Sequence, residues 1–166
     1  EGIMPDLSIA ENLVIGFHAD SSFTHRWILP FKNKWFLRRD VIKGYAQKLA
    51  NEYGVKAPDV DLPAGTLSGG NMQRLILARE LSFNPALLLA DKPTSGLDVG
   101  SQEYIRRRLV GLIDRGNAVL LVSEDLDEVL KLSGRIAVIY EGEIVGLVSA
   151  DKATKEDIGL MMVGGR

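Results

Sequence analysis

The segment Leu67–Asn71, with the sequence LSGGN, has the residue types of an anion-binding site. Its two glycines, Gly69 and Gly70, let a backbone approach a ligand closely, and a helical pattern of apolar residues follows them. The free N–H groups at the start of such a helix attract phosphate. Taken alone, the pentapeptide favours a glycine-containing helix start without a ligand. Evidence for a ligand must therefore come from the rest of the chain.

Carboxylates follow at two further positions with chemical potential. An apolar run, LLLA, ends in Asp91, whose carboxylate is able to hold a magnesium ion through water. The alternative is a strand-ending aspartate that caps the next turn. The turn Pro93–Leu97 leads to Asp98, and another apolar run then leads to the segment SEDLDEVL. Three such motifs in this order narrow the possible functions more than any one of them does.

Composition excludes several classes of site and partner. The 166 residues suit one domain or slightly more, and a net charge of −2 gives no signal for nucleic-acid binding. The chain has no cysteine, so disulfides and thiolate metal sites are excluded. The two histidines, His18 and His25, are too few for a typical metal site. No run of apolar residues is long enough to span a bilayer.

The segments before residue 67 are predicted to form a helical subdomain, residues 1–66. A helix starts after Ser8, where Glu11 is placed to complete a capping box. Residues 18–37 are predicted to be irregular and rich in aromatic residues. A second helix ends near Gly54 and has apolar residues at helical spacing: Val41, Ile42, Tyr45, Leu49 and Tyr53.

From residue 67 to residue 166 the pattern indicates an α/β fold with a parallel sheet. The short apolar runs ALLLA, AVLLVS and RIAVIY alternate with helix-like segments, which is typical of strands joined by crossover helices. The segment AVIYEGEIVGLV instead predicts a terminal hairpin that turns at Glu141 and Gly142.

These motifs resemble those of the ATP-binding subunits of ABC transporters. Leu67, Ser68, Gly69, Gly70 and Asn71 match the signature, Leu87–Asp91 the Walker B strand, and Ser95, Gly96, Leu97 and Asp98 the D-loop. Asn71 in the fifth signature position and the ending IGLMMVGG resemble the importers of simple sugars and nucleosides. In that class one polypeptide carries two ATPase halves. The chain resembles the C-terminal part of the second half, which is part of a phosphate-loop NTPase core with a helical subdomain.

The resemblance also implies ligands, partners and a location. ATP and Mg²⁺ are expected only in the complete assembly, with Asp91 acting on Mg²⁺ through water. The expected partners are a second ATPase half (in the same polypeptide or a dimer mate), membrane permease subunits and, indirectly, a substrate-binding protein, without nucleic acid. The expected location is the cytoplasmic face of the cell membrane, as a peripheral subunit.

The chain departs from the family pattern in ways that affect catalysis. No GxxxxGK[ST] segment occurs, and neither does the Q-loop, so the chain is expected to be a fragment that is inactive alone. Lys92 stands where the family has its catalytic glutamate, and Glu124 stands where it has the switch histidine. A charged lysine cannot accept a proton from water. In the family, each ATP lies between one half's phosphate loop and the other half's signature. LSGGN is therefore expected to act on ATP held by the partner, while this half's own site is degenerate.

Two interpretations of Lys92 and Glu124 remain open at this stage. The residues either form an ion pair, with Asp91 as an alternative partner for Lys92, or are two independent solvated side chains. Two rival functions also remain: a non-transport ABC ATPase, and a structural or regulatory half without catalysis. The arginines Arg106, Arg107 and Arg108 are predicted to form a solvated helix face. The aromatic cluster from Trp27 to Phe36 is predicted either to contact the permease or to pack in a core.

Overall fold

The structure is a computed structural model that describes residues 2–17, 24–26 and 35–165. The chain forms two compact units, Glu1–Pro85 with Gly96–Asp98, and Ala86–Ser95 with Val99–Arg166. The predicted helical subdomain, residues 1–66, and the predicted ATPase-core part, residues 67–166, stay predictions. The predictions for His18, for the His25 side chain and for the cluster from Trp27 to Phe36 lie outside the residues, or the side chains, that the structure describes.

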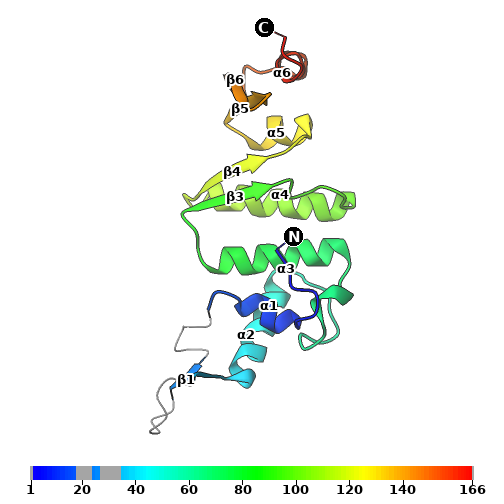
Figure 1. The fold of residues 1–166 in the computed structure, drawn as a ribbon, viewed down its shortest axis with the longest axis vertical. Coiled ribbons are helices and arrows are strands. Elements are labelled where there is room, and N and C mark those ends of the chain that lie inside the picture. Colours follow the sequence, from blue (N-terminus) through cyan, green and yellow to red (C-terminus); the bar gives the residue numbers. More distant parts are fainter. Residues whose placement is uncertain (1, 18–23, 27–34, 166) are drawn as a thin grey trace. The chain divides into compact units, whose positions relative to one another are not determined.

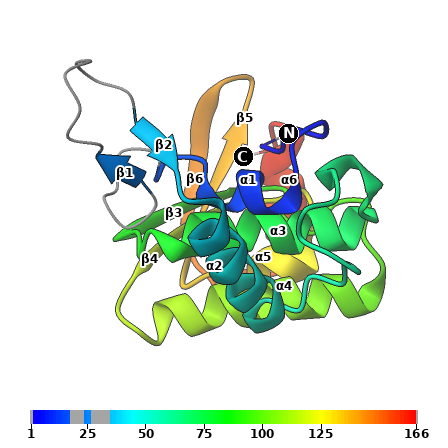
Figure 2. The ribbon, with the colours of Figure 1, turned by 90° about the horizontal axis from the view of Figure 1, so that it is seen from below.

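The first unit is built on α1 (Ile9–Val14), α2 (Arg39–Glu52), the short η1 (Ala64–Thr66) and α3 (Gly69–Ser82). Helix α1 packs against both α2 and α3 (Figure 2). Its buried side chains Ile9 and Leu13 form the core together with Leu75 of α3 and Val60. Because α1 carries apolar residues on the faces it turns to α2 and α3, it lies at the centre of this unit.

The start of α1 confirms the predicted capping box. The Glu11 amide donates to Ser8 Oγ at 3.1 Å, and the Ser8 amide donates to Glu11 Oε2 at 2.8 Å. Helix α2 ends as predicted, with Tyr53 as its C-cap and Gly54 at φ +64°, a left-handed conformation that glycine adopts at little cost. Within the range predicted to be irregular, β1 (Thr24–Arg26) and β2 (Trp35–Leu37) form an antiparallel pair, so that part of the prediction is wrong.

The second unit begins with a parallel pair of strands. Strand β3 (Leu87–Asp91) pairs with β4 (Ala118–Val122), and α4 (Val99–Ile113) connects them and packs on β4 (Figure 1). The register places Asp91 opposite Val122, so the carboxyl ends of both strands meet at one edge. The segments that follow these ends, Lys92 and onward and Ser123 and onward, therefore lie close together. This pairing is the parallel sheet that the sequence predicts.

The third apolar run forms β5 (Arg135–Tyr140) after α5 (Leu126–Leu132), but in the described part of the chain it pairs with β6 (Glu143–Ser149) rather than with the parallel pair. The hairpin turns at Glu141 and Gly142, which both have positive φ as the primed turns require. That turn confirms the prediction. The last helix, α6 (Lys155–Met162), was not predicted from the sequence. It packs against β5 and contributes Ile158 to the core around Ile136 and Val138.

Among the helices of the described residues, none is long and apolar enough to cross a membrane.

Candidate functional site

The signature residues lie at the start of α3, where the first amides of a helix lack intrahelical acceptors. Ser68 is the N-cap residue in an extended conformation, with φ −66° and ψ 157°, and its side chain makes no capping hydrogen bond. The first amide of the helix to bond back is that of Met72, which donates to the Ser68 carbonyl at 2.9 Å. The amides of Gly69, Gly70 and Asn71 therefore have no intrahelical acceptor, which is the arrangement that binds anions.

Asn71 orients the hydroxyl group of Ser68. Its Nδ2 donates to Ser68 Oγ at 3.1 Å, while its Oδ1 accepts from the Lys56 amide at 3.0 Å. Because Ser68 Oγ acts as an acceptor toward Asn71, its own proton remains available to donate to a ligand. The fifth residue of the signature thus connects the loop after α2 with the hydroxyl that would meet a phosphate.

The D-loop residues Gly96–Asp98 belong to the first unit, where Leu97 lies beside the signature. A Cβ atom built on Gly69 would lie 3.8 Å from Leu97 Cδ2, which is ordinary van der Waals contact. Gly96 adopts φ +71°, a conformation that other residues rarely take, so a glycine is needed at this turn. The two predicted motifs are therefore next to each other, although they are far apart in the sequence.

The ends of β3 and β4 carry Asp91, Lys92 and Glu124, for which the sequence predicts catalytic positions. Asp91 is exposed at the end of β3. Lys92 follows in a left-handed conformation, φ +45°, which is uncommon for a residue with a side chain. Its amide donates to the Val122 carbonyl at 2.8 Å, and its carbonyl accepts from the Ser95 amide at 3.2 Å. These two hydrogen bonds fix the backbone from which the Lys92 side chain projects.

Lys92 and Glu124 form an ion pair, in which Lys92 Nζ donates to Glu124 Oε1. The first of the two interpretations is therefore confirmed. The hydrogen bond to Glu124 raises the pKa of Lys92 above its usual value, and the charge of Asp91 adds to this effect. The Lys92 ammonium is thus held in its charged form, and such a group cannot act as the general base toward water.

Asp91 is the residue at this edge that is predicted to bind a metal ion. Among the described residues, no group of three or more histidine, cysteine, aspartate or glutamate side chains could hold a metal ion. Mg²⁺ often binds through one or two carboxylates together with waters and substrate phosphates, so a single aspartate fits as one ligand. The Lys92 ammonium next to Asp91 opposes a second positive charge there.

A buried glutamate near these strand ends was not predicted from the sequence. Glu128 of α5 is fully buried and bonds to Thr94, Arg106 and Ser123. The prediction that Arg106 belongs to a solvated face is therefore wrong, since its side chain is 21% exposed and pairs with Glu128 and Asp125. For Arg107, which is 78% exposed and pairs with Glu103 one turn away, the prediction is confirmed. Only the tertiary structure brings Arg106 and Glu128 together.

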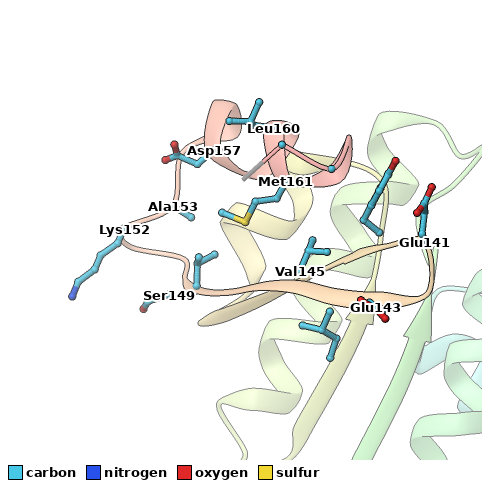
Figure 3. A pocket seen from close by; sticks show the side chains of 14 residues that line it. Glu141, Glu143, Val145, Ser149, Lys152, Ala153, Asp157, Leu160 and Met161 are labelled. Atoms are coloured by element: carbon cyan, nitrogen blue, oxygen red, sulfur yellow. The ribbon is translucent and has the colours of Figure 1, made fainter.

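A cavity lies between β6 and α6 in the second unit (Figure 3). Its volume is about 1100 Å³, and Val145, Leu160 and Met161 are among its apolar lining residues. Figure 3 shows Met161 extending from α6 toward the strands below it. A Cβ atom at Gly146 would collide with Met161 Sδ, so the thioether packs directly on this glycine. None of the predicted site residues lines this cavity, which belongs to the packing of the C-terminal hairpin.

Similarity to a family of known proteins identifies the family of this chain. The family model described as ABC transporter matches residues 1–95, which include the signature and the start of the D-loop. The chain belongs to the ABC transporter family. ATP and Mg²⁺ are the ligands that this family of ATPases implies.

Curated relatives in the ABC transporter family match almost the entire chain. The chain is 41% identical over 165 residues to the nucleoside import ATP-binding protein NupA of Lactococcus lactis subsp. cremoris, and this match covers 99% of the chain and 31% of NupA. It is 39% identical to the guanosine import ATP-binding protein NupO of Bacillus subtilis, covering 98% of the chain and 30% of NupO. The chain thus spans about a third of the length of these relatives.

A solved ATP-binding cassette has the same fold. The chain matches the cassette MJ0796, in a dimeric post-hydrolysis state bound to ADP and Pi, with a TM-score of 0.66 and 23% identity. The match covers 89% of this chain and 59% of that chain. The predicted fold, part of an ABC ATPase core with a helical portion, is therefore confirmed.

Proposed function

We propose that the chain is the helical and C-terminal part of the second ATPase half of an ABC importer for a sugar or nucleoside. Ser68, Gly69, Gly70 and Asn71 act on ATP that the partner half holds, and the site to which Lys92 and Glu124 belong is degenerate. ATP hydrolysis at the partner's site then drives import, and this chain supplies one wall of that site.

The observation that supports this proposal is the contrast between the two sets of residues. The start of α3 keeps its free amides, and Ser68 keeps a proton to donate, as phosphate binding requires. At the strand ends, the lysine that stands at the general-base position is paired with Glu124. One set is fit to bind phosphate and the other is unfit to activate water. Such a division is expected if the two sets serve different nucleotides.

The remaining motif residues have supporting roles in this proposal. Asp91 binds Mg²⁺ through water in the complete assembly, where nucleotide phosphates supply further ligands. The D-loop residues Ser95–Asp98, next to the signature at Gly69, communicate across the interface between the two halves.

The relatives support the class of substrate and the partners. NupA is named a nucleoside importer, and the ATP-binding protein RbsA of Oceanobacillus iheyensis, 38% identical over 165 residues, is named a ribose importer. We infer that the complete protein binds permease subunits at the cytoplasmic face of the membrane and serves a substrate-binding protein indirectly. Hydrolysis and transport belong to that assembly, because the chain has no phosphate-loop sequence.

Changing Ser68 in the full-length protein tests the proposal. We expect Ser68→Arg to abolish substrate uptake and to reduce ATP hydrolysis by at least about 10²-fold, the scale of losing one group that stabilises developing charge. The bulky cation would block the close approach of the Gly69 and Gly70 backbone to the partner's ATP. The measurements are radiolabelled uptake in cells and phosphate release by the purified transporter.

A matched variant separates this effect from the addition of a charge. Gln47→Arg places the same cation on the exposed face of α2 in the same unit, and we expect it to leave uptake at the wild-type level. Wild-type uptake in Ser68→Arg would show that this signature is not used. A loss in both variants would indicate that the unit tolerates no added cation, and it would remove the support for a role of Ser68.

A further inference from the structure

The buried side chain of Glu128 joins three segments around the strand ends. It is 0% exposed and is the only charged residue among the buried residues of the described ranges. It lies in the first turn of α5, a helix that Asp125 caps by accepting from the amides of Asp127 and Glu128. A buried carboxylate is costly unless it is paired and hydrogen-bonded, so its partners indicate its role.

The partners of Glu128 come from three different segments of the chain: the turn after β3, helix α4 and the residue after β4. Its Oε1 accepts from Thr94 Oγ1 at 2.8 Å and from Arg106 Nε of α4 at 3.1 Å. Its Oε2 accepts from Ser123 Oγ at 2.7 Å. Ser123 Oγ in turn accepts from the Asp125 amide at 3.1 Å. The carboxylate is therefore satisfied on both oxygens, and its charge is paired with that of Arg106.

Two of these partners directly flank the ion pair. Thr94 follows Lys92 in the turn after β3, and Ser123 immediately precedes Glu124 at the end of β4. Each oxygen of Glu128 thus holds one of the two segments that carry the paired side chains. Lys92 itself has an unfavourable left-handed backbone, which persists only when surrounding contacts fix it. The bond from Thr94 to Glu128 is one such contact.

We propose that Glu128 is a positioning residue that holds Lys92 and Glu124 in contact through Thr94 and Ser123. The inference rests on the proposed function and deepens it, because it means that a buried residue fixes the geometry of Lys92 and Glu124. Arg106 supplies the charge that allows the carboxylate to be buried and connects the arrangement to α4, the helix that follows the D-loop.

If Glu128 served only the stability of α5, its loss would have different consequences. Asp127, the neighbour of Glu128 in the same helical turn, pairs with Lys155 Nζ at 2.7 Å. If Glu128 only stabilised α5, its loss would disturb the pair of Lys155 with Asp127, which lies within the helix, at least as much as the pair of Lys92 with Glu124. If it positions the strand ends, its loss disturbs the Lys92 pair alone.

Carbodiimide cross-linking in the full-length protein distinguishes these cases. The reagent activates a carboxylate, and an amine in direct contact then displaces the activating group to form an amide, with the carboxylate oxygen leaving in the urea by-product. We expect Glu128→Gln, which keeps the size but loses an acceptor and the charge, to lower the yield of the cross-link between Lys92 and Glu124 severalfold. Glu124→Gln, which removes the carboxylate, sets the background. The cross-link between Lys155 and Asp127 is expected to keep its wild-type yield.

Milder variants give a second measurement if Glu128→Gln does not fold. Thr94→Val and Ser123→Ala each remove one hydrogen bond to Glu128, and we expect each to lower the yield of the cross-link between Lys92 and Glu124 in part. Adding either to Glu128→Gln is expected to give no further decrease, since all three act through one arrangement. An unchanged yield in these variants, or an equal fall for the cross-link between Lys155 and Asp127, would overturn the proposal. Cross-linking requires neither ATP nor transport, so it fails or succeeds independently of the proposed function.

Discussion

Lys92 is the residue on which the proposal of a degenerate site depends most. Its ammonium is bonded to Glu124 across the ends of two parallel strands, and the backbone below it is held by Val122 and Ser95. The two opposite charges leave the pair neutral, and a paired ammonium is unable to accept a proton from water. A conformation this constrained is unlike that of two independent solvated side chains.

The pKa of Lys92 provides a prediction for this single residue. The hydrogen bond to Glu124 raises the pKa of Lys92. The pair therefore stabilises the folded protein fully below the ordinary lysine pKa, and this contribution is lost as the pH rises through the raised value. We expect NMR titration of the Lys92 side chain to give a pKa above that of a free lysine, and Glu124→Gln to bring it down. A Lys92 pKa that Glu124→Gln leaves unchanged would contradict the pairing in solution.

At the scale of elements, the sequence predicts what local chemistry determines. The capping box at Ser8, the end of α2 at Gly54 and the turn at Glu141 and Gly142 each depend on residues a few positions apart, and the structure has all three. Strands β3 and β4 were predictable because both are continuous apolar runs.

Features that depend on distant residues were not predictable in this way. The partners of Glu128 lie up to 34 positions away in the sequence, and no local pattern indicates that this glutamate is buried. Arg106 has the same residue type as its exposed neighbour Arg107, and only its pairing with Asp125 and Glu128 distinguishes it. The β1–β2 pair was missed because three-residue strands are too short to show alternation.

The contact of α6 with the hairpin gives a prediction at the scale of elements. A Cβ atom at Gly146 collides with Met161 Sδ, so Gly146→Ala overpacks this contact and is expected to cost about 1–3 kcal/mol of local stability. Gly159→Ala in α6 is the control, because a Cβ atom there meets nothing within 4 Å, and alanine favours a helix by up to about 1 kcal/mol over glycine.

Native-state hydrogen exchange of the amides in β6 and α6 measures both effects. We expect faster exchange in Gly146→Ala and unchanged or slower exchange in Gly159→Ala. Unchanged exchange in Gly146→Ala would show that Met161 moves aside without cost.

At the scale of the whole molecule, the β3–β4 pair leaves an apolar face exposed. Within the described residues, β4 pairs only with β3, and Leu87, Leu89, Leu120 and Val122 are each at least 45% exposed. Unpaired strand edges and apolar faces of this kind promote association with other chains. We therefore expect the isolated 166-residue chain to self-associate, with a mass by light scattering that rises with concentration.

A charged substitution on this face is the matched control. Leu120→Lys places an ammonium on the exposed side of β4, where it disfavours edge-to-edge pairing. We expect this variant to shift the isolated chain toward the monomer. A monomeric wild-type chain at high concentration would contradict the prediction.

The central claim is that this half supplies its signature to ATP on the partner half while its own site is degenerate. Vanadate trapping of a photoreactive ATP analogue in the full-length transporter tests this claim most directly, because the cross-link reports which half holds the hydrolysed nucleotide. We expect a trapped nucleotide cross-linked to the partner half, and its loss in Ser68→Arg. A trapped nucleotide on the half that carries Lys92, or undiminished trapping in Ser68→Arg, would contradict it.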